Sequence, residues 1–260
     1  MKFHSLASSS AGNAYLVESA GSVLMIDCGI AARSEMLARM GSVGISPDSI
    51  VGIVFTHDHS DHAKGLGVFH RKFPDIPLFA NLMTSEAIAS SAGVPEEEFI
   101  PFENGQSFEV GPFEVCAFSI PHDVPDPVGF MVRAEGIVYF HATDVGTPLD
   151  SIGVHLAEAD YATLEANHDR GLLAGSDRSE MLKRRIRGPR GHLSNDETAD
   201  LVRRFASRRL KALRLAHLSC ECNAPHLADA AVRDALRDIA REDVDLAVLP
   251  PYEPVTWGAA

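Results

Sequence analysis

The stretch Ile50-Val51-Gly52-Ile53-Val54-Phe55-Thr56 runs without a break into His57-Asp58-His59-Ser60-Asp61-His62. The apolar part predicts a buried strand, so the four candidate ligands His57, His59, Asp61 and His62 follow directly from a strand end. In an extended loop, positions i and i+2 point to the same side, so His57 and His59 can share one metal. Asp61 and His62 then face a second metal. Imidazole and carboxylate ligands suit zinc by default, and also manganese or iron.

The composition is that of an ordinary globular protein. The chain has 260 residues, of which 45% are hydrophobic and 23% are charged, which excludes a disordered or fibrous chain. No apolar run approaches the roughly 18 residues that a membrane span needs, and the N-terminal residues lack the pattern of a signal peptide. Four cysteines are too few for a disulfide scaffold. We therefore expect a cytoplasmic protein without a membrane partner.

The charge is unevenly distributed along the chain. The overall net charge of −13 argues, taken alone, against a nucleic-acid partner. Residues 170–214, however, hold 13 basic and only 5 acidic side chains, a local balance of +8 against −21 for the remainder. Such a segregation predicts a basic face on an acidic body, which can bind an anionic polymer.

Alternating strand-like and helix-like segments predict layered α/β packing in one domain spanning residues 1–260. The expected strands are Phe3–Ala7, Ala14–Glu18, Val23–Asp27, Ile50–Thr56, Leu78–Ala80, Phe113–Ile120, Gly129–Arg133, Ile137–His141, Ala159–Leu164 and Leu213–Ala216. The expected helices are Ala32–Met40, Ala63–Phe73, Ser179–Arg187, Asn195–Arg208 and Ala224–Arg241. Ser194, three residues before Glu197, has the spacing of a capping box.

The histidine motif in its strand context resembles the metallo-β-lactamase-fold superfamily, whose fold is an αββα sandwich with a metal site at the edge between its sheets. The resemblance implies further ligands at later strand ends, and His122, Asp144 and His217 occur there in the right order. By this analogy metal 1 is bound by His57, His59, His122 and Asp144. Metal 2 is bound by Asp61, His62, Asp144 and His217.

Several strings narrow the resemblance to the YycJ/WalJ-type metallohydrolases, a bacterial family associated with DNA exonuclease activity and related to ribonuclease Z. They are Ser8-Ser9-Ser10-Ala11-Gly12-Asn13, Leu164-Glu165-Ala166-Asn167-His168-Asp169, Lys183-Arg184-Arg185-Ile186, Gly191-His192-Leu193-Ser194-Asn195 and Ala216-His217-Leu218-Ser219-Cys220-Glu221-Cys222-Asn223. Cys222 stands where the family pattern leads us to expect asparagine.

Two residues are candidates for the catalytic chemistry. Two metals lower the pKa of a bridging water and neutralise phosphate oxygens, and Asp61 can orient the resulting hydroxide. His192 lies in a Gly-His-Leu-Ser turn before a capped helix N-terminus, where backbone N–H groups favour a phosphate. His192 can stabilise the scissile phosphate or protonate the leaving oxygen, although a loop histidine that packs on the helix is the alternative.

Substrate-binding candidates lie in two segments. The run from Lys183 to Arg190 concentrates cations just upstream of His192, and we expect Lys183, Arg184, Arg185 and Arg187 to contact phosphates rather than only to form a solvated helix face. Ser9 and Asn13 belong to a small-residue loop that either lines the site or forms a tight hairpin.

These observations favour a binuclear metal-dependent phosphodiesterase, a nuclease that trims the 5′ ends of DNA in preference to RNA. The first alternative is a small-molecule hydrolase of the same fold, such as a thioesterase, lactonase or cyclic phosphodiesterase. The second is a binding or regulatory protein without metals, against which the intact set of ligand candidates argues.

Overall fold

The computed structural model describes residues 1–258, which fold into two compact units. Unit 1 comprises Met1–Ser119, Val124–Gly136 and the described residues from Pro250 onward, and unit 2 comprises Ile120–Asp123 and Ile137–Leu249. Each unit is therefore assembled from segments that are distant in the sequence. The expectation of one domain stays a prediction.

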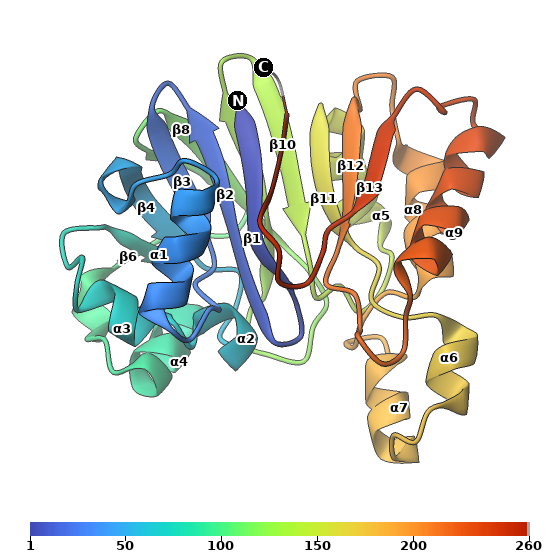
Figure 1. Cartoon of the computed structure of the whole chain (residues 1–260), viewed down its shortest axis with the longest axis horizontal. Coiled ribbons are helices and arrows are strands. Elements are labelled where there is room, and N and C mark those ends of the chain that lie inside the picture. Colours follow the sequence, from blue (N-terminus) through green and yellow to red (C-terminus); the bar gives the residue numbers. More distant parts are fainter. Residues whose placement is uncertain (259–260) are drawn as a thin grey trace. The chain divides into compact units, whose positions relative to one another are not determined.

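Unit 1 is built on a seven-stranded sheet with the order β14-β1-β2-β3-β4-β5-β6 (Figure 1). β1 pairs antiparallel with β14 and β2, and β2 pairs antiparallel with β3, whereas β3 to β6 are parallel. The strands are β1 Lys2–Ser9, β2 Gly12–Ser19, β3 Ser22–Ile26, β4 Ile50–Val54, β5 Leu78–Ala80, β6 Phe99–Pro101 and β14 Val255–Gly258.

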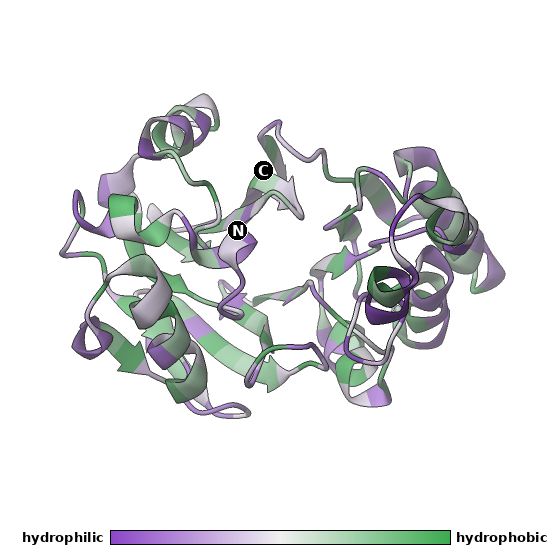
Figure 2. Cartoon of the chain, turned by 90° about the horizontal axis from the view of Figure 1, so that it is seen from below, coloured by the Kyte–Doolittle hydropathy of each residue, from purple (hydrophilic) through white to green (hydrophobic). Residues whose placement is uncertain are grey.

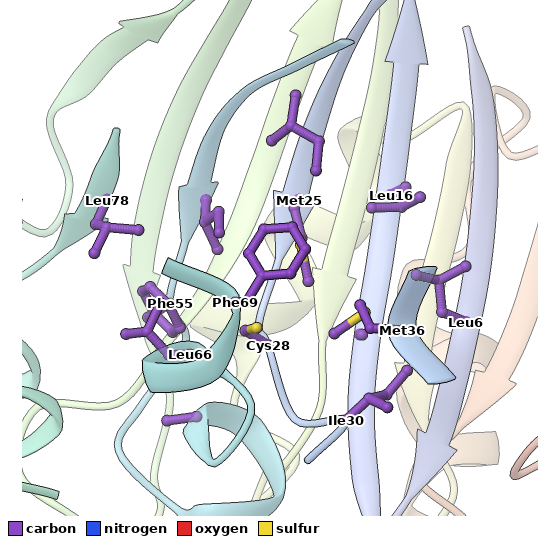
Figure 3. Packing of buried hydrophobic residues seen from close by; sticks show 14 of the residues in the cluster. Leu6, Leu16, Met25, Cys28, Ile30, Met36, Phe55, Leu66, Phe69 and Leu78 are labelled. Carbon is purple, nitrogen blue, oxygen red and sulfur yellow. The ribbon is translucent and has the colours of Figure 1, made fainter. Parts of the chain in front are cut away.

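Helices and a second layer of strands cover this sheet. The helices are α1 Arg33–Ser42, α2 Ser60–Ala63, α3 Leu66–His70 and α4 Leu82–Ala92, with 3-10 turns at Pro47–Ser49 and Glu96–Glu98. Leu16 and Met25 of the sheet, Met36 of α1 and Phe69 of α3 belong to one buried cluster, seen in Figure 3. The strands β7 Ser107–Val110, β8 Phe113–Ser119 and β9 Val128–Ala134 form an antiparallel layer.

Unit 2 holds four parallel strands, β10 Ile137–Ala142, β11 Tyr161–Glu165, β12 Ala212–Ala216 and β13 Asp245–Val248. The connecting helices are α5 Asp150–Glu158, α6 Arg170–Gly175, α7 Glu180–Ile186, α8 Asn195–Phe205 and α9 Pro225–Asp238. Figure 2 shows long hydrophilic stretches on these helices. Within this unit, Figure 1 draws α6 and α7 beyond the carboxyl ends of the strands.

Most of the expected elements are present. The capping box at the start of α8 is confirmed, because Ser194 and Glu197 bond reciprocally there. The single helix expected over Ala63–Phe73 is wrong: it is divided between α2 and α3, because the N–H of Gly65 donates to the carbonyl of Cys28 instead of continuing a helix. In residues 1–258, no helix combines the length and the apolar character that a bilayer crossing requires.

Candidate metal centre and active site

Two neighbouring parallel strands of unit 1 position its candidate ligands. Asp27 follows β3 directly, and His57 follows β4 two residues after Phe55. Carboxyl ends of parallel strands meet at one edge of a sheet, so these side chains gather there. Asp27 has φ of 62°, a left-handed conformation that is uncommon for a residue with a Cβ. Backbone outliers of this kind concentrate at functional sites.

Asp27 anchors a histidine of the motif. Its Oδ2 lies 2.7 Å from Nδ1 of His62, and both residues are fully buried. The same carboxylate accepts hydrogen bonds from the backbone N–H and the hydroxyl of Thr56. A carboxylate on Nδ1 sets the tautomer of an imidazole and directs its Nε2 outward, as in metal-binding histidines.

The rest of the motif clusters around His57. The ring centroid of His57 lies 4.9 Å from that of His59 and 4.1 Å from that of His62, and the Nδ1 of His57 lies 2.9 Å from the Thr56 hydroxyl. Asp61 and His62 lie in the first turn of α2, so the expectation of an extended loop is wrong at these two positions. The motif nevertheless brings three imidazoles and one carboxylate together.

Asn13 and Ser9 lie behind this motif. The Asn13 amide nitrogen donates to the Ser9 carbonyl, lies 3.3 Å from Oδ2 of Asp61 and lies 3.0 Å from Nε2 of His62. Both Asn13 and Ser9 are buried, and the backbone N–H of Ser9 donates to the Asn13 side chain. In this structure both residues support the histidine motif, and the Ser9 N–H is used within the loop.

One glycine allows the motif to pack this closely. A Cβ at Gly29 would lie 1.8 Å from the carbonyl oxygen of Asp61 and 2.6 Å from the backbone nitrogen of Asn13. Any other residue at this position would therefore displace either the motif or the Asn13 loop.

Three neighbouring strands of unit 2 end in polar residues at one sheet edge. Asp144 follows β10, Glu165 is the last residue of β11, and His217 follows β12. Asp144 and His217 have φ of 62° and 56°, so both leave their strands in the left-handed region. All three are buried, and burial of this much charge requires extensive hydrogen bonding.

Glu165 meets that requirement for the whole cluster. Its Oε1 accepts from the backbone N–H of Asp144, and its Oε2 accepts from those of Val145 and Leu193. The same Oε1 lies 2.9 Å from Nδ1 of His192 and 2.9 Å from Nδ1 of His217. Burial on its own would raise the pKa of Glu165, but the His192 charge and the hydrogen bonds from both histidines outweigh it and lower that pKa.

His192 is held at the end of a tight loop. A Cβ at Gly191 would lie 2.2 Å from the carbonyl oxygen of Arg185, so the close approach of this loop to the end of α7 requires glycine. The Nδ1 of His192 also lies 3.6 Å from Oδ1 of Asp144. Burial on its own would lower the pKa of His192, but the Glu165 carboxylate outweighs it and raises that pKa. His192 therefore retains a proton more strongly than a free imidazole does.

His122 belongs to the same cluster. Its Nδ1 lies 3.0 Å from the carbonyl oxygen of Gly191, and its Nε2 lies 3.7 Å from Oδ1 of Asp144. Its ring centroid is 5.1 Å from that of His192. A backbone carbonyl on Nδ1 again makes Nε2 the nitrogen that a metal would take.

The donor chemistry of both units fits divalent metal ions. His62, His122 and His217 each have Nδ1 on a carboxylate or a carbonyl, the arrangement that orients metal-ligating histidines. Within unit 2, ligand atoms of Asp144, Glu165, His192 and His217 all lie within 4.8 Å of one another. Imidazole and carboxylate donors of this kind can hold zinc, manganese or iron.

The basic segment contains one buried lysine and several accessible arginines. Lys183 is buried, and its Nζ donates to the carbonyl of Ala174 and pairs with Glu180. The Arg185 guanidinium pairs with Asp123, next to His122. Arg184 is exposed, and Arg187 is half exposed with Glu180 at 3.8 Å. The burial of Lys183 makes it a structural residue here, while the arginines remain accessible.

Two carboxylates were missed as site residues by the sequence reasoning. Asp27 was the last residue of a predicted strand, and Glu165 stood only within a string that carried the family resemblance. A signal was present in both cases, since each is an acidic residue at the end of an apolar strand. Nothing in the spacing, however, indicated that Asp27 would meet His62 or that Glu165 would meet His192.

Comparison with known proteins agrees with this geometry. The model of the beta-lactamase superfamily domain matches residues 23–213. Exodeoxyribonuclease WalJ of Streptococcus pneumoniae is 30% identical over 250 residues, covering 95% of this chain and 91% of that protein. The chain belongs to the beta-lactamase superfamily, in the family of WalJ. Exodeoxyribonuclease YycJ of Bacillus anthracis is 31% identical over 240 residues, covering 92% of this chain and 90% of that protein.

The same fold is found in a solved structure. The metallo-beta-lactamase fold protein YhfI of Bacillus subtilis matches with a TM-score of 0.73 at 16% identity, covering 98% of this chain and 99% of that chain. The expected α/β fold class and the resemblance to the WalJ and YycJ family are thus confirmed. As a member of this superfamily the chain is a hydrolase with a His/Asp cluster suited to metal ions.

Proposed function

We propose that this member of the WalJ family is a two-metal phosphodiesterase that removes nucleotides from the 5′ ends of DNA. The relatives WalJ and YycJ are named exodeoxyribonucleases and align with nearly the whole chain. The observation that carries the proposal is the Glu165–His192 pair at 2.9 Å beside Asp144, a proton donor positioned next to candidate metal ligands.

The proposed ligand set is the one that the family resemblance implies. Metal 1 is bound by His57, His59, His122 and Asp144, and metal 2 by Asp61, His62, Asp144 and His217. When bound, such divalent ions supply Lewis acidity toward the phosphate and lower the pKa of a water molecule. Zinc is the default, since imidazole and carboxylate donors with anchored Nδ1 atoms favour it.

The residues of the chain then provide orientation and proton transfer. The Asp61 carboxylate orients a water molecule that has given up one proton to solvent, and the oxygen of this water forms a bond to phosphorus while the ester P–O bond breaks. The His192 imidazolium donates its proton to the departing oxygen, and Glu165 holds the ring in place and stabilises its charge. The capped N-terminus of α8 lies two residues beyond His192 and favours an anion in its vicinity.

The arginines of the basic segment give the enzyme its preference for a polymer. Arg184, Arg185 and Arg187 are proposed to contact backbone phosphates, which adds affinity for DNA without adding to the chemical step. Lys183 is excluded from this set because it is buried and bonded to Ala174. Since none of the four cysteines forms a disulfide, we propose the cytoplasm as the compartment.

The test is incubation of the metal-loaded protein with end-labelled duplex DNA, RNA and a chromogenic phosphodiester. We expect mononucleotides to accumulate from labelled 5′ ends of DNA, with slower attack on RNA. Hydrolysis of thioesters or lactones without hydrolysis of DNA would instead identify a small-molecule hydrolase.

The basic segment is tested by neutralising Arg184 and Arg185 to glutamine. DNA binding should weaken, and the slope of log affinity against log salt should fall by about 0.9 for each phosphate that the variant no longer neutralises. Arg233→Gln with Arg237→Gln is the matched control, because both are exposed arginines of α9 that pair with aspartates on their own helix. An equal weakening of DNA binding in the two double variants would remove the segment from the proposal.

A further inference from the structure

Unit 2 contains a cavity that the proposed metal chemistry does not use, and one of its lining residues, Arg187, is among the arginines proposed to contact phosphates. Its volume is about 300 Å³, and it is lined by His168, Arg170, Leu173, Ala174, Arg187 and Glu197. The cavity therefore combines two guanidinium groups and an imidazole with a small apolar wall. A volume near 300 Å³ is at the lower end of the range for ligand-binding pockets.

His168 is the unusual member of this set. The residue is 1% exposed, and its buried Nδ1 has no hydrogen-bond partner among the described residues. Leaving a buried polar atom without a partner is costly, and such an atom in a native structure calls for an explanation, of which a bound water molecule or ion is one. His168 lines the cavity, and in its neutral form the imidazole has one N–H that could donate to an anion there.

The arginines retain donors for such an anion. The contact of Arg187 with Glu180 is long, at 3.8 Å. Arg170 uses its Nε for the Ser194 hydroxyl and keeps a guanidinium terminus that lies 3.4 Å from Glu197. Oε2 of Glu197 is already occupied by the N–H and the hydroxyl of Ser194 in the capping box. Both guanidinium groups also lie near carboxylates, Arg170 near Asp196 and Glu197 and Arg187 near Glu180, so an anion in the cavity would bind the N–H donors that these contacts leave over.

The cavity and the proposed proton donor share one piece of backbone. The segment after Glu165 and the segment after His192 run side by side, with a parallel bridge between His168 and Ser194. The N–H of Asn195 donates to the carbonyl of His168, which reinforces this pairing. A group held in the cavity is therefore positioned by the same segments that position His192.

We propose that this cavity binds a phosphate group of the substrate strand other than the one that is cleaved, and so sets the position of the strand relative to His192. The inference rests on the proposed function, because it takes the substrate to be a nucleic-acid strand. Guanidinium groups match phosphate oxygens in a bidentate geometry, and the imidazole N–H adds a third donor.

The test is a scan of the strand with neutral phosphates. A set of labelled DNA strands is made, each with one methylphosphonate at a different position, together with strands whose 5′ end carries a phosphate or a hydroxyl. Binding is measured by fluorescence anisotropy and hydrolysis by gel, for the metal-loaded wild type and for Arg187→Gln, Arg170→Gln and His168→Asn. Arg233→Gln is the control, since this exposed arginine pairs with Asp229 outside the cavity.

We expect neutralisation at one position other than the scissile phosphate to weaken wild-type binding about tenfold, the effect expected for a charge-assisted hydrogen bond. In Arg187→Gln the penalty at that position should disappear while those at other positions remain. If His168→Asn unfolds, Arg187→Gln still decides the result. A penalty at a methylphosphonate position would identify an internal phosphate. A similar weakening on replacing the 5′-phosphate by a hydroxyl, absent in Arg187→Gln, would identify the terminal phosphate.

Two failures can be told apart. If the strands are bound and hydrolysed but the position profile is the same in the wild type and in all cavity variants, the phosphate cavity is overturned and the nuclease proposal stands. If the wild type neither binds nor hydrolyses any strand, the nuclease proposal and this inference both fall.

Discussion

The Nδ1 of His192 lies 2.9 Å from Oε1 of Glu165, and that same oxygen lies 2.9 Å from Nδ1 of His217. One carboxylate oxygen therefore orients both the proposed proton donor and a proposed metal ligand. A change at Glu165 must disturb metal binding and proton transfer together, whereas a change at His192 can separate them.

Replacing His59 tests the proposed metal ligands. The wild type should hold close to two divalent ions per chain, and His59→Ala should lower that number and abolish hydrolysis because a proposed metal ligand is removed. Elemental analysis and a rate measurement check both effects. His226→Ala is the control, since this exposed histidine lies at the start of α9. A wild-type protein purified without chelators and found to contain no metal would refute the ligand assignment.

His192→Ala should separate metal binding from turnover. We expect both metals to remain and the turnover of DNA to fall by roughly 10²–10⁴, the usual contribution of a positioned acid. A nitrophenyl phosphodiester should be affected less, because its leaving group needs no proton. Metal content and the rates on both substrates are measured together. Full activity on DNA would remove His192 from the mechanism, and a reduced metal content would make it a ligand.

Glu165→Gln should lower both the stability of the fold and the affinity for metal. Glutamine has the same shape as glutamate. Its NH2 group, however, would face the backbone N–H of Asp144 or Val145, which now donates a hydrogen bond to a carboxylate oxygen of Glu165. A buried donor without an acceptor costs about 1–3 kcal/mol, and removal of a carboxylate that orients a metal-binding histidine typically weakens metal binding about 10- to 100-fold. Thermal unfolding with and without chelator, and metal titration, give the two values. Wild-type affinity in the variant would contradict the anchoring role.

Asp160 should make stability depend on pH. Partial burial on its own would raise its pKa, but the Val138 N–H, the Arg209 guanidinium and the Lys211 charge outweigh it and lower the pKa. A folded-state pKa below the unfolded value of about 3.9 means that the stabilisation is present above roughly pH 4 and is lost as the pH falls through the folded-state pKa.

The comparison with Asp160→Asn measures this effect. The wild type should unfold at a higher temperature than the variant at pH 7, and the gap should narrow as the pH falls below about 4. Asp234→Asn is the control, because that carboxylate and its partner Arg237 are both exposed on α9. A gap that is independent of pH would show that the charge of Asp160 does not stabilise the fold.

Local patterns in the sequence were enough to predict many of the elements. The apolar run Ile50–Thr56 predicted β4, and the Ser194–Glu197 spacing predicted the start of α8, because strand burial and helix capping depend on neighbouring residues. The helix expected across Gly65 was wrong, since the hydrogen bond from Gly65 to Cys28 joins residues that are far apart in the sequence. Three helices, α4, α5 and α6, and the short strands β6, β7, β13 and β14 were not predicted.

The sequence by itself determined the chemical class of this protein. A strand that runs into His57, His59, Asp61 and His62 indicates a metal-dependent hydrolase, and that inference needs only the order and spacing of the residues. Only the tertiary structure decided which groups support those side chains. Asp27 reaches His62 across 35 positions, and Glu165 reaches His217 across 52, because parallel strands bring their carboxyl ends to one edge. Spacing along the chain carries no information about such pairs, since the sheet order that creates them is set by packing of the whole unit.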